Sequence, residues 1–149
     1  MHILFVDAGN YCRSPAAETV ARTQAARAGL SDRVVFASAG LKDKHAGDTA
    51  DPRTIEACRA RGYGLDGFRC REITPLDFAR ADLILAMDRE NLAALEARRP
   101  PGDTTPIRLF LDEAEVPDPY FGDVDGFDAM MDQIEAGATT LLERLRGKP

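Results

Sequence analysis

The residues best suited to chemistry follow a short apolar run near the amino terminus. This segment reads Val6-Asp-Ala-Gly-Asn-Tyr-Cys-Arg-Ser-Pro15 and leads into an expected helix. The backbone N–H groups of a small-residue turn can curl around an anion, and a helix amino terminus adds the positive end of its dipole. Arg13 offers a guanidinium fork for phosphate-type oxygens, while Asn10 and Ser14 can hold the turn in shape. The turn is therefore a candidate anion site, although an ordinary strand-to-helix turn with an exposed arginine fits the same residues.

A second segment, Val116-Pro-Asp-Pro-Tyr-Phe-Gly122, places one carboxylate between two prolines. A rigid loop of this kind can present Asp118 as a general acid to a leaving oxygen within hydrogen-bond reach. Tyr120 and Phe121 would then form the pocket wall. The alternative is that Asp118 is a turn residue and that the two aromatic residues belong to the core.

These two segments need a scaffold that brings them together, and the hydrophobic pattern indicates one. Short apolar runs predict four buried strands, and the segments between them carry helix signals such as a cap residue followed by proline. Ser14 is the expected cap of the first helix, and Thr74 to Asp77 has capping-box spacing. The expected strands are 2–6, 33–38, 83–87 and 107–111, and the expected helices are 14–28, 51–61, 88–97 and a last one that spans Phe127 to Leu145.

Strands that alternate with helices predict an α/β fold, because parallel neighbours need crossover connections. We expect a single doubly wound domain over residues 1–149, with a four-stranded parallel sheet and helices on both faces. Ligands of such sheets bind outside the carboxyl ends of the strands. The turn after the first strand and the loop after the fourth strand open toward this edge.

Composition narrows the class of partner. The chain has 149 residues, a formal net charge of -6 and 30% charged residues, which argues against nucleic-acid and anionic-membrane binding. The first apolar run, Ile3 to Val6, is far shorter than the ~20 residues of a membrane helix. The three cysteines show neither disulfide-framework nor zinc-ligand spacing. We expect a cytoplasmic protein with free thiols.

No metal or cofactor site is expected. Three acidic residues, Asp123, Asp125 and Asp128, lie close together but lack the glycine and the terminal glutamate of a calcium loop. They are better interpreted as negative charge at the start of the last helix, where the helix dipole favours it.

Several separate motifs, taken in order, resemble the low-molecular-weight protein tyrosine phosphatase family, which shares its fold with a class of arsenate reductases. The match covers nearly the whole chain. It consists of Ile3-Leu-Phe-Val6, Gly9-Asn10-x-Cys12-Arg13-Ser14-Pro15-x-Ala17-Glu18, Ser38-Ala39-Gly40, Gly47, Asp51-Pro52-Arg53, Asp82-Leu-Ile-Leu-Ala-Met-Asp88 with Asn91, and Asp118-Pro-Tyr120.

The resemblance implies a role for each matching residue. Arg13 and the backbone amides of the turn would bind the phosphoryl group of phosphotyrosine, of an aryl phosphate or of inorganic phosphate, and Asp118 would protonate the leaving oxygen. Asn10, Ser14 and Ser38 would support the loop, while Tyr11 and Tyr120 would line the mouth. The amides concerned are those of Ala8, Gly9, Asn10, Tyr11, Cys12 and Arg13.

One residue departs from the family pattern. The family loop has the form Cys-x5-Arg, and its first cysteine attacks phosphorus, but the residue six positions before Arg13 is Asp7. Cys12 corresponds to the second cysteine of the family loop, whose suggested role is to protect the first by forming a disulfide. Cys12 begins at the wrong point of the loop to replace the nucleophile.

The aspartate changes the expected chemistry. A carboxylate about 4 Å from a bound phosphate repels it by about 4 kcal/mol per charge pair at an effective dielectric constant of about 20. Aspartyl phosphates form elsewhere, but generally with a metal that neutralises charge. We therefore expect Asp7, at the nucleophile position, to leave a severely slowed phosphatase.

Asp7 is either a laboratory substitution in a working enzyme or a natural feature of a pseudophosphatase that binds phosphate or phosphotyrosine without turnover. Arsenate reduction in this fold uses further cysteines late in the chain. It ranks low because no cysteine follows Cys70.

Overall fold

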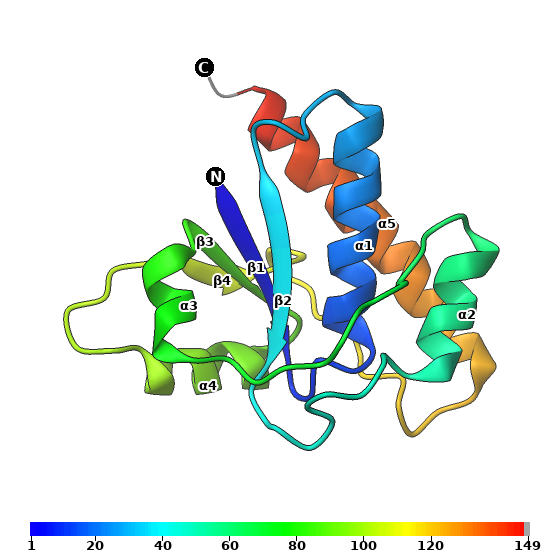
Figure 1. The fold of residues 1–149 in the computed structure, drawn as a ribbon, viewed down its shortest axis with the longest axis horizontal. Helices are drawn as coiled ribbons and strands as arrows, with labels where there is room; N and C mark the ends of the chain where they lie inside the picture. The colour runs from blue at the N-terminus through cyan, green and yellow to red at the C-terminus, as the bar shows by residue number, and fades with distance from the viewer. Residues whose placement is uncertain (148–149) are drawn as a thin grey trace.

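The computed structural model describes residues 1–147 and contains four strands and five helices in that range (Figure 1). All the expected strands and long helices are present, with ends that differ by a few residues. In chain order the elements are β1 (His2–Asp7), α1 (Arg13–Arg27), β2 (Val35–Gly40), α2 (Pro52–Ala60), α3 (Pro75–Arg80), β3 (Leu83–Ala86), α4 (Arg89–Arg98), β4 (Ile107–Leu109) and α5 (Val124–Arg146).

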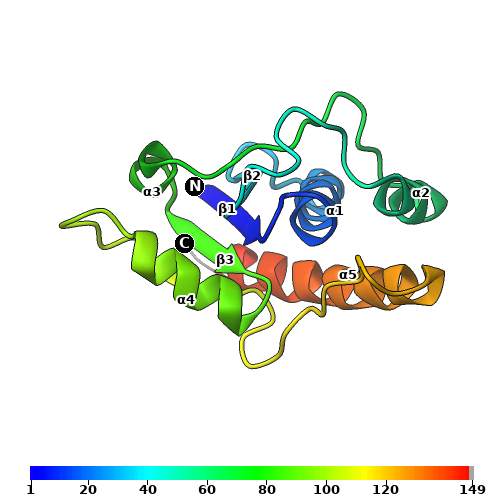
Figure 2. The same ribbon diagram turned by 90° about the horizontal axis from the view of Figure 1, so that it is seen from below.

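The strands form one parallel sheet in the order β2-β1-β3-β4, which confirms the predicted α/β class. Alternate residues of β1 enter different cores, because successive side chains of a strand point to opposite faces. Ile3 and Phe5 pack with α1 and α5, whereas Leu4 and Val6 pack with α3 and α4. Figure 2 shows these helix pairs on the two sides of the strands.

The helix starts follow from local capping, with one correction. Asp51 and Asp88 each accept a backbone N–H at the start of α2 and α4, and Thr74 and Asp77 form a capping box at α3. Ser14 is not the cap of α1, because that helix begins at Arg13 after Cys12. The Ser14 N–H is instead satisfied by the Asp7 carboxylate, 2.9 Å away.

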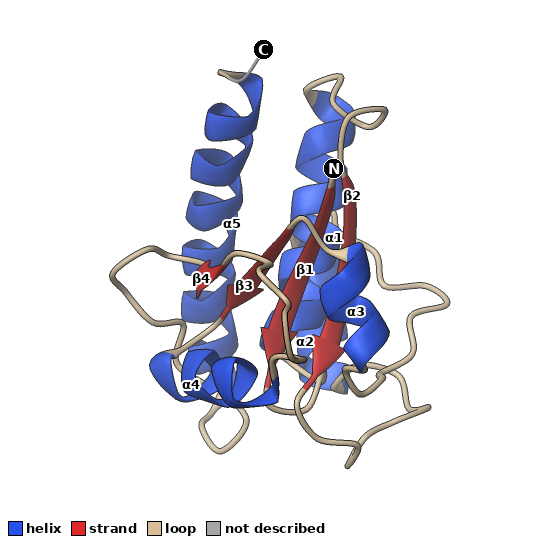
Figure 3. Ribbon diagram, turned by 90° about the vertical axis from the view of Figure 1, so that its left-hand side faces the viewer, coloured by secondary structure: helices blue, strands red, loops and turns tan. Residues whose placement is uncertain are grey.

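The sheet order places a topological switch point at β1, since the chain goes from β1 to β2 on one side and returns to β3 on the other. The loops that follow β1 and β2 meet at the carboxyl edge of the sheet (Figure 3). Gly40 ends β2 there, and a Cβ on it would lie 2.7 Å from the backbone nitrogen of Asn10. A glycine at this position lets the two loops come into contact.

No helix within residues 1–147 is both long enough and apolar enough to cross a membrane.

Candidate functional site

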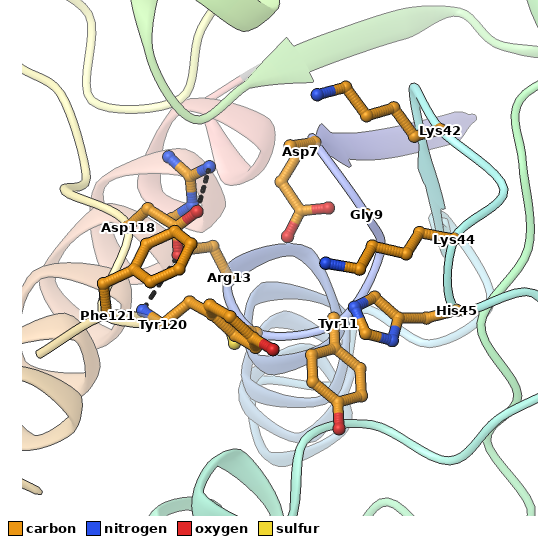
Figure 4. Close-up of a pocket in the computed structure, with 12 residues that line it drawn as sticks. Asp7, Gly9, Tyr11, Arg13, Lys42, Lys44, His45, Asp118, Tyr120 and Phe121 are labelled. Carbon is orange, nitrogen blue, oxygen red and sulfur yellow. Dashed lines mark hydrogen bonds and ion pairs between the residues drawn. The ribbon is translucent and has the colours of Figure 1, made fainter.

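A pocket of about 200 Å³ opens at this edge of the sheet (Figure 4). Three loops line it, and they lie far apart in the sequence. The first, after β1, contributes Asp7, Ala8, Gly9, Tyr11, Cys12 and Arg13; the second, after β2, contributes Lys42, Lys44 and His45; the third, before α5, contributes Asp118, Tyr120 and Phe121. The structure thus brings together the two segments that the sequence analysis singled out.

Asp7 lies at the bottom of this pocket with 2% of its surface exposed. One carboxylate oxygen accepts the backbone N–H of Asn10 at 2.5 Å, and the other accepts that of Ser14 at 2.9 Å. Burial raises the pKa of Asp7, while the Arg13 charge and these N–H groups act in the opposite direction. The carboxylate therefore takes one N–H group of the turn, that of Asn10, and one at the start of α1, that of Ser14.

Asn10 holds the turn in its shape. Its backbone has a φ of 57°, in the left-handed region that asparagine tolerates better than most residues. Its side-chain amide donates to the hydroxyl oxygens of Ser14 at 2.9 Å and Ser38 at 3.0 Å, and its side-chain oxygen accepts the Arg71 N–H at 2.9 Å. Ser38 in turn donates to the buried carboxylate of Glu18 at 2.6 Å.

Arg13 is buried and held from two sides. Its Nη1 donates to Asp88 at 2.7 Å and to the carbonyl oxygen of Val116 at 2.9 Å, so the guanidinium orientation is fixed. Its Nη2 lies 3.7 Å from the Asp118 carboxylate. The Asp118 side chain keeps 43% of its surface exposed, which leaves it accessible to a molecule in the pocket.

Aromatic side chains surround the mouth of the pocket. Tyr11 stacks on the His45 ring with centroids 3.7 Å apart, and the Tyr120 ring lies 6.0 Å from Tyr11. Phe121 meets Tyr120 edge-on but keeps 91% of its surface exposed, so it forms the outer rim rather than an enclosed wall. Arg53 sits over the Tyr120 ring at 5.4 Å.

Sequence reasoning missed four residues of the site. Asp88 was expected at the start of a helix and as the end of a family motif, with no role in the site; one of its oxygens caps that helix and the other accepts from Arg13. Lys42, Lys44 and His45 lie in a polar loop with no motif of their own. The signal that could have found them is topological, because this loop follows a parallel strand and must open at the same edge as the turn after β1.

The three cysteines are free, as expected, and the structure shows all three to be buried. Cys12 lies against Asp51, and burial is the main cause that raises the pKa of its thiol. Burial also raises the pKa of Cys58 to about 12 and that of Cys70 to about 11. None of the described thiols is therefore activated as a nucleophile. Residues 1–147 also hold no cluster of three or more side chains able to bind a metal ion.

Comparisons with known proteins identify the family of this chain. The family model described as low molecular weight phosphotyrosine protein phosphatase matches residues 2–149. The low molecular weight protein-tyrosine-phosphatase of Streptomyces coelicolor is 39% identical, over 97% of this chain and 93% of its own length.

Two solved structures extend the comparison. A protein tyrosine phosphatase from Entamoeba histolytica, with Hepes in the active site, has a TM-score of 0.92 at 36% identity and covers 98% of this chain and 97% of its own. A Drosophila arginine phosphatase has a TM-score of 0.92 at 31% identity and covers all of both chains. With this match in sequence and fold, the chain belongs to the low molecular weight phosphotyrosine protein phosphatase family.

Proposed function

We propose that the site is built to hydrolyse phosphotyrosine or aryl phosphates, and that the chain itself turns over very slowly because Asp7 stands at the nucleophile position. The observation that carries this proposal is the convergence of Arg13 and Asp118 on one pocket, with 3.7 Å between guanidinium and carboxylate. The first is suited to hold a phosphoryl group and the second to protonate a leaving oxygen beside it.

In this proposal the amides of residues 8–13 and the Arg13 guanidinium bind the phosphoryl oxygens. The aryl ring of the substrate lies at the mouth of the pocket, where Tyr11 and Tyr120 line it. Asn10, Ser14 and Ser38 hold the loop through the hydrogen bonds that join them. In the family reaction a thiolate attacks phosphorus, the aryl oxygen leaves with a proton from the acid, and water then cleaves the phosphocysteine.

Asp7 interferes with this reaction in two ways. Its carboxylate adds a negative charge about 4 Å from the phosphoryl position, which repels a bound phosphate by about 4 kcal/mol per charge pair at an effective dielectric constant of about 20. It also takes up the N–H groups of Asn10 and Ser14. A carboxylate that attacks phosphorus usually relies on a metal ion to neutralise this charge.

A second candidate function is binding of phosphate or phosphotyrosine without turnover. The fixed guanidinium of Arg13 and the Asn10 hydrogen bonds favour it, because they hold an anion site independently of the nucleophile. Calorimetry with a phosphotyrosine peptide tests this candidate. Binding that disappears in the Arg13→Ala variant supports it, and no binding by the unaltered chain rules it out.

Hydrolysis by an Asp7→Cys variant tests the first proposal. We expect this variant to hydrolyse an aryl phosphate and a phosphotyrosine peptide, and a second substitution, Asp118→Ala, to slow the reaction by about 10²- to 10⁴-fold, the range for general acids. A phosphoarginine peptide belongs in the same assay, since one structural relative is named an arginine phosphatase. A folded Asp7→Cys variant with no activity would refute the proposal.

We also propose that residues 1–149 form one domain of this family and that the protein works in the cytoplasm. The family match over residues 2–149 supports the first statement, and three free, buried thiols support the second.

A further inference from the structure

Two lysines face the pocket from the loop after β2. Figure 4 shows the side chains of Lys42 and Lys44 extending toward Asp7 from the same side. Both residues are exposed, whereas Arg13 is buried. The lysines therefore lie at the rim of the pocket, outside the position of a phosphoryl group held by Arg13.

The lysine loop is fixed against the turn after β1. The backbone N–H of Lys42 donates to the carbonyl oxygen of Ala8 at 2.9 Å, and that of Leu41 donates to the carbonyl oxygen of Asp7 at 3.0 Å. His45, next to Lys44, stacks on Tyr11 at 3.7 Å. These contacts fix the backbone that carries both lysines beside the anion site.

The positive charge of these lysines is available to a ligand. Within residues 1–147 neither ammonium group forms an ion pair or a hydrogen bond, and Lys44 Nζ lies over the Tyr120 ring, 5.7 Å from its centroid. Arg13, by contrast, is already paired with Asp88 and lies beside Asp118. An anion at the rim would thus meet two cations without a competing carboxylate partner.

We propose that Lys42 and Lys44 determine substrate specificity by selecting phosphopeptides that carry an acidic residue beside the phosphorylated one. The inference rests on the proposed function, which puts the phosphoryl group and its ring in the pocket and the peptide chain at the rim. A carboxylate within about two residues of the phosphorylated side chain then pairs with the lysines. The ionic contacts are exposed, so each contributes about 0.2–1 kcal/mol, and the effect falls with salt.

Binding to an Asp7→Ser variant tests the inference without turnover. The probes are two synthetic phosphotyrosine peptides that differ only in Glu or Gln on both sides of the phosphotyrosine. We expect the Glu peptide to bind about 3- to 10-fold more tightly at low salt. Adding Lys42→Ala and Lys44→Ala removes this preference. The matched control, Arg80→Ala, removes an exposed cation at the end of α3, near the opposite edge of the sheet, and leaves the preference unchanged.

The outcomes separate this inference from the proposed function. Three results would overturn the inference: equal affinity of the Asp7→Ser variant for the two peptides, an equal loss of affinity for both peptides in the lysine variant, or no binding of either peptide. If Asp7→Cys hydrolyses aryl phosphate while the two peptides bind equally, the function stands and the lysine role falls. If Asp7→Cys is inactive but the preference is present and depends on the lysines, the lysine role stands and the hydrolytic function falls.

Discussion

Replacing Asp7 by serine should strengthen phosphate binding more than any other single change in the pocket. The substitution removes a buried carboxylate and frees the N–H groups of Asn10 and Ser14, which Asp7 now occupies at 2.5 and 2.9 Å. The repulsion removed is about 4 kcal/mol for unit charges about 4 Å apart at an effective dielectric constant of about 20. Since each 1.4 kcal/mol changes an affinity tenfold, removing this repulsion should raise the affinity for phosphate by about 10³-fold.

Protonation of Asp7 sets an upper limit on this gain. Burial raises the pKa of Asp7, and a bound phosphate would raise it further, so the unaltered chain can take up a proton when it binds the anion. The affinity of the unaltered chain for phosphate should therefore increase as the pH falls, because a neutral Asp7 no longer repels the ligand. The serine variant lacks the part of this pH dependence that comes from protonation of Asp7.

Isothermal calorimetry with inorganic phosphate at pH 7 and pH 5 measures both effects. We expect the Asp7→Ser variant to bind about 10²- to 10³-fold more tightly at pH 7, with a smaller difference at pH 5. Equal affinities at pH 7 would refute the charge argument, provided that circular dichroism shows both proteins folded.

Four further predictions concern the stability of the fold and the reactivity of its thiols. Gly40→Ala should destabilise the protein by about 1–3 kcal/mol, because its Cβ would lie 2.7 Å from backbone atoms, while Gly64→Ala, with open space around it, should be near neutral in the same denaturant titration. Asn10→Gly keeps a positive φ accessible but removes the side-chain hydrogen bonds, so it should lower the free energy of unfolding by about 2–4 kcal/mol. No change in this free energy would show that those hydrogen bonds are dispensable. The Cys70 thiol, whose pKa burial raises to about 11, should react with iodoacetamide about 100-fold more slowly in the folded protein than in urea at pH 8. Because the raised thiol pKa values belong to the folded state, stability should fall as the pH rises above about 8.5, where only the unfolded chain ionises, and a flat profile from pH 7 to 10 would contradict this linkage.

The fold could be predicted because its signals are local. Apolar runs such as Ile3 to Val6 define strands, and cap residues such as Asp51 and Asp88 define helix starts within a few residues of their position. The proximity of Arg13 and Asp118 could also be predicted from the sequence, because both lie after strands whose carboxyl ends share one edge of the sheet.

The rest of the site depends on contacts between distant segments. The Lys42 and Lys44 loop has no pattern of its own, and its place beside Ala8 is set by the pairing of β2 with β1. Ser14 was expected as a cap because serine before proline is a common helix start, but the Asp7 carboxylate accepts its N–H and the observed cap is Cys12, two residues earlier. Such a contact between the end of a strand and the start of a helix is visible only in the folded chain.

The measurement that tests the central claim most directly is the hydrolysis of 4-nitrophenyl phosphate by the unaltered chain, with and without magnesium, beside the Asp7→Cys variant. We expect the unaltered chain to turn over far more slowly than the variant in either condition, and the variant to show clear turnover without metal. Turnover by the unaltered chain at a rate close to that of the variant would contradict the account, because Asp7 would then serve as an effective nucleophile in a site that we describe as blocked by its charge.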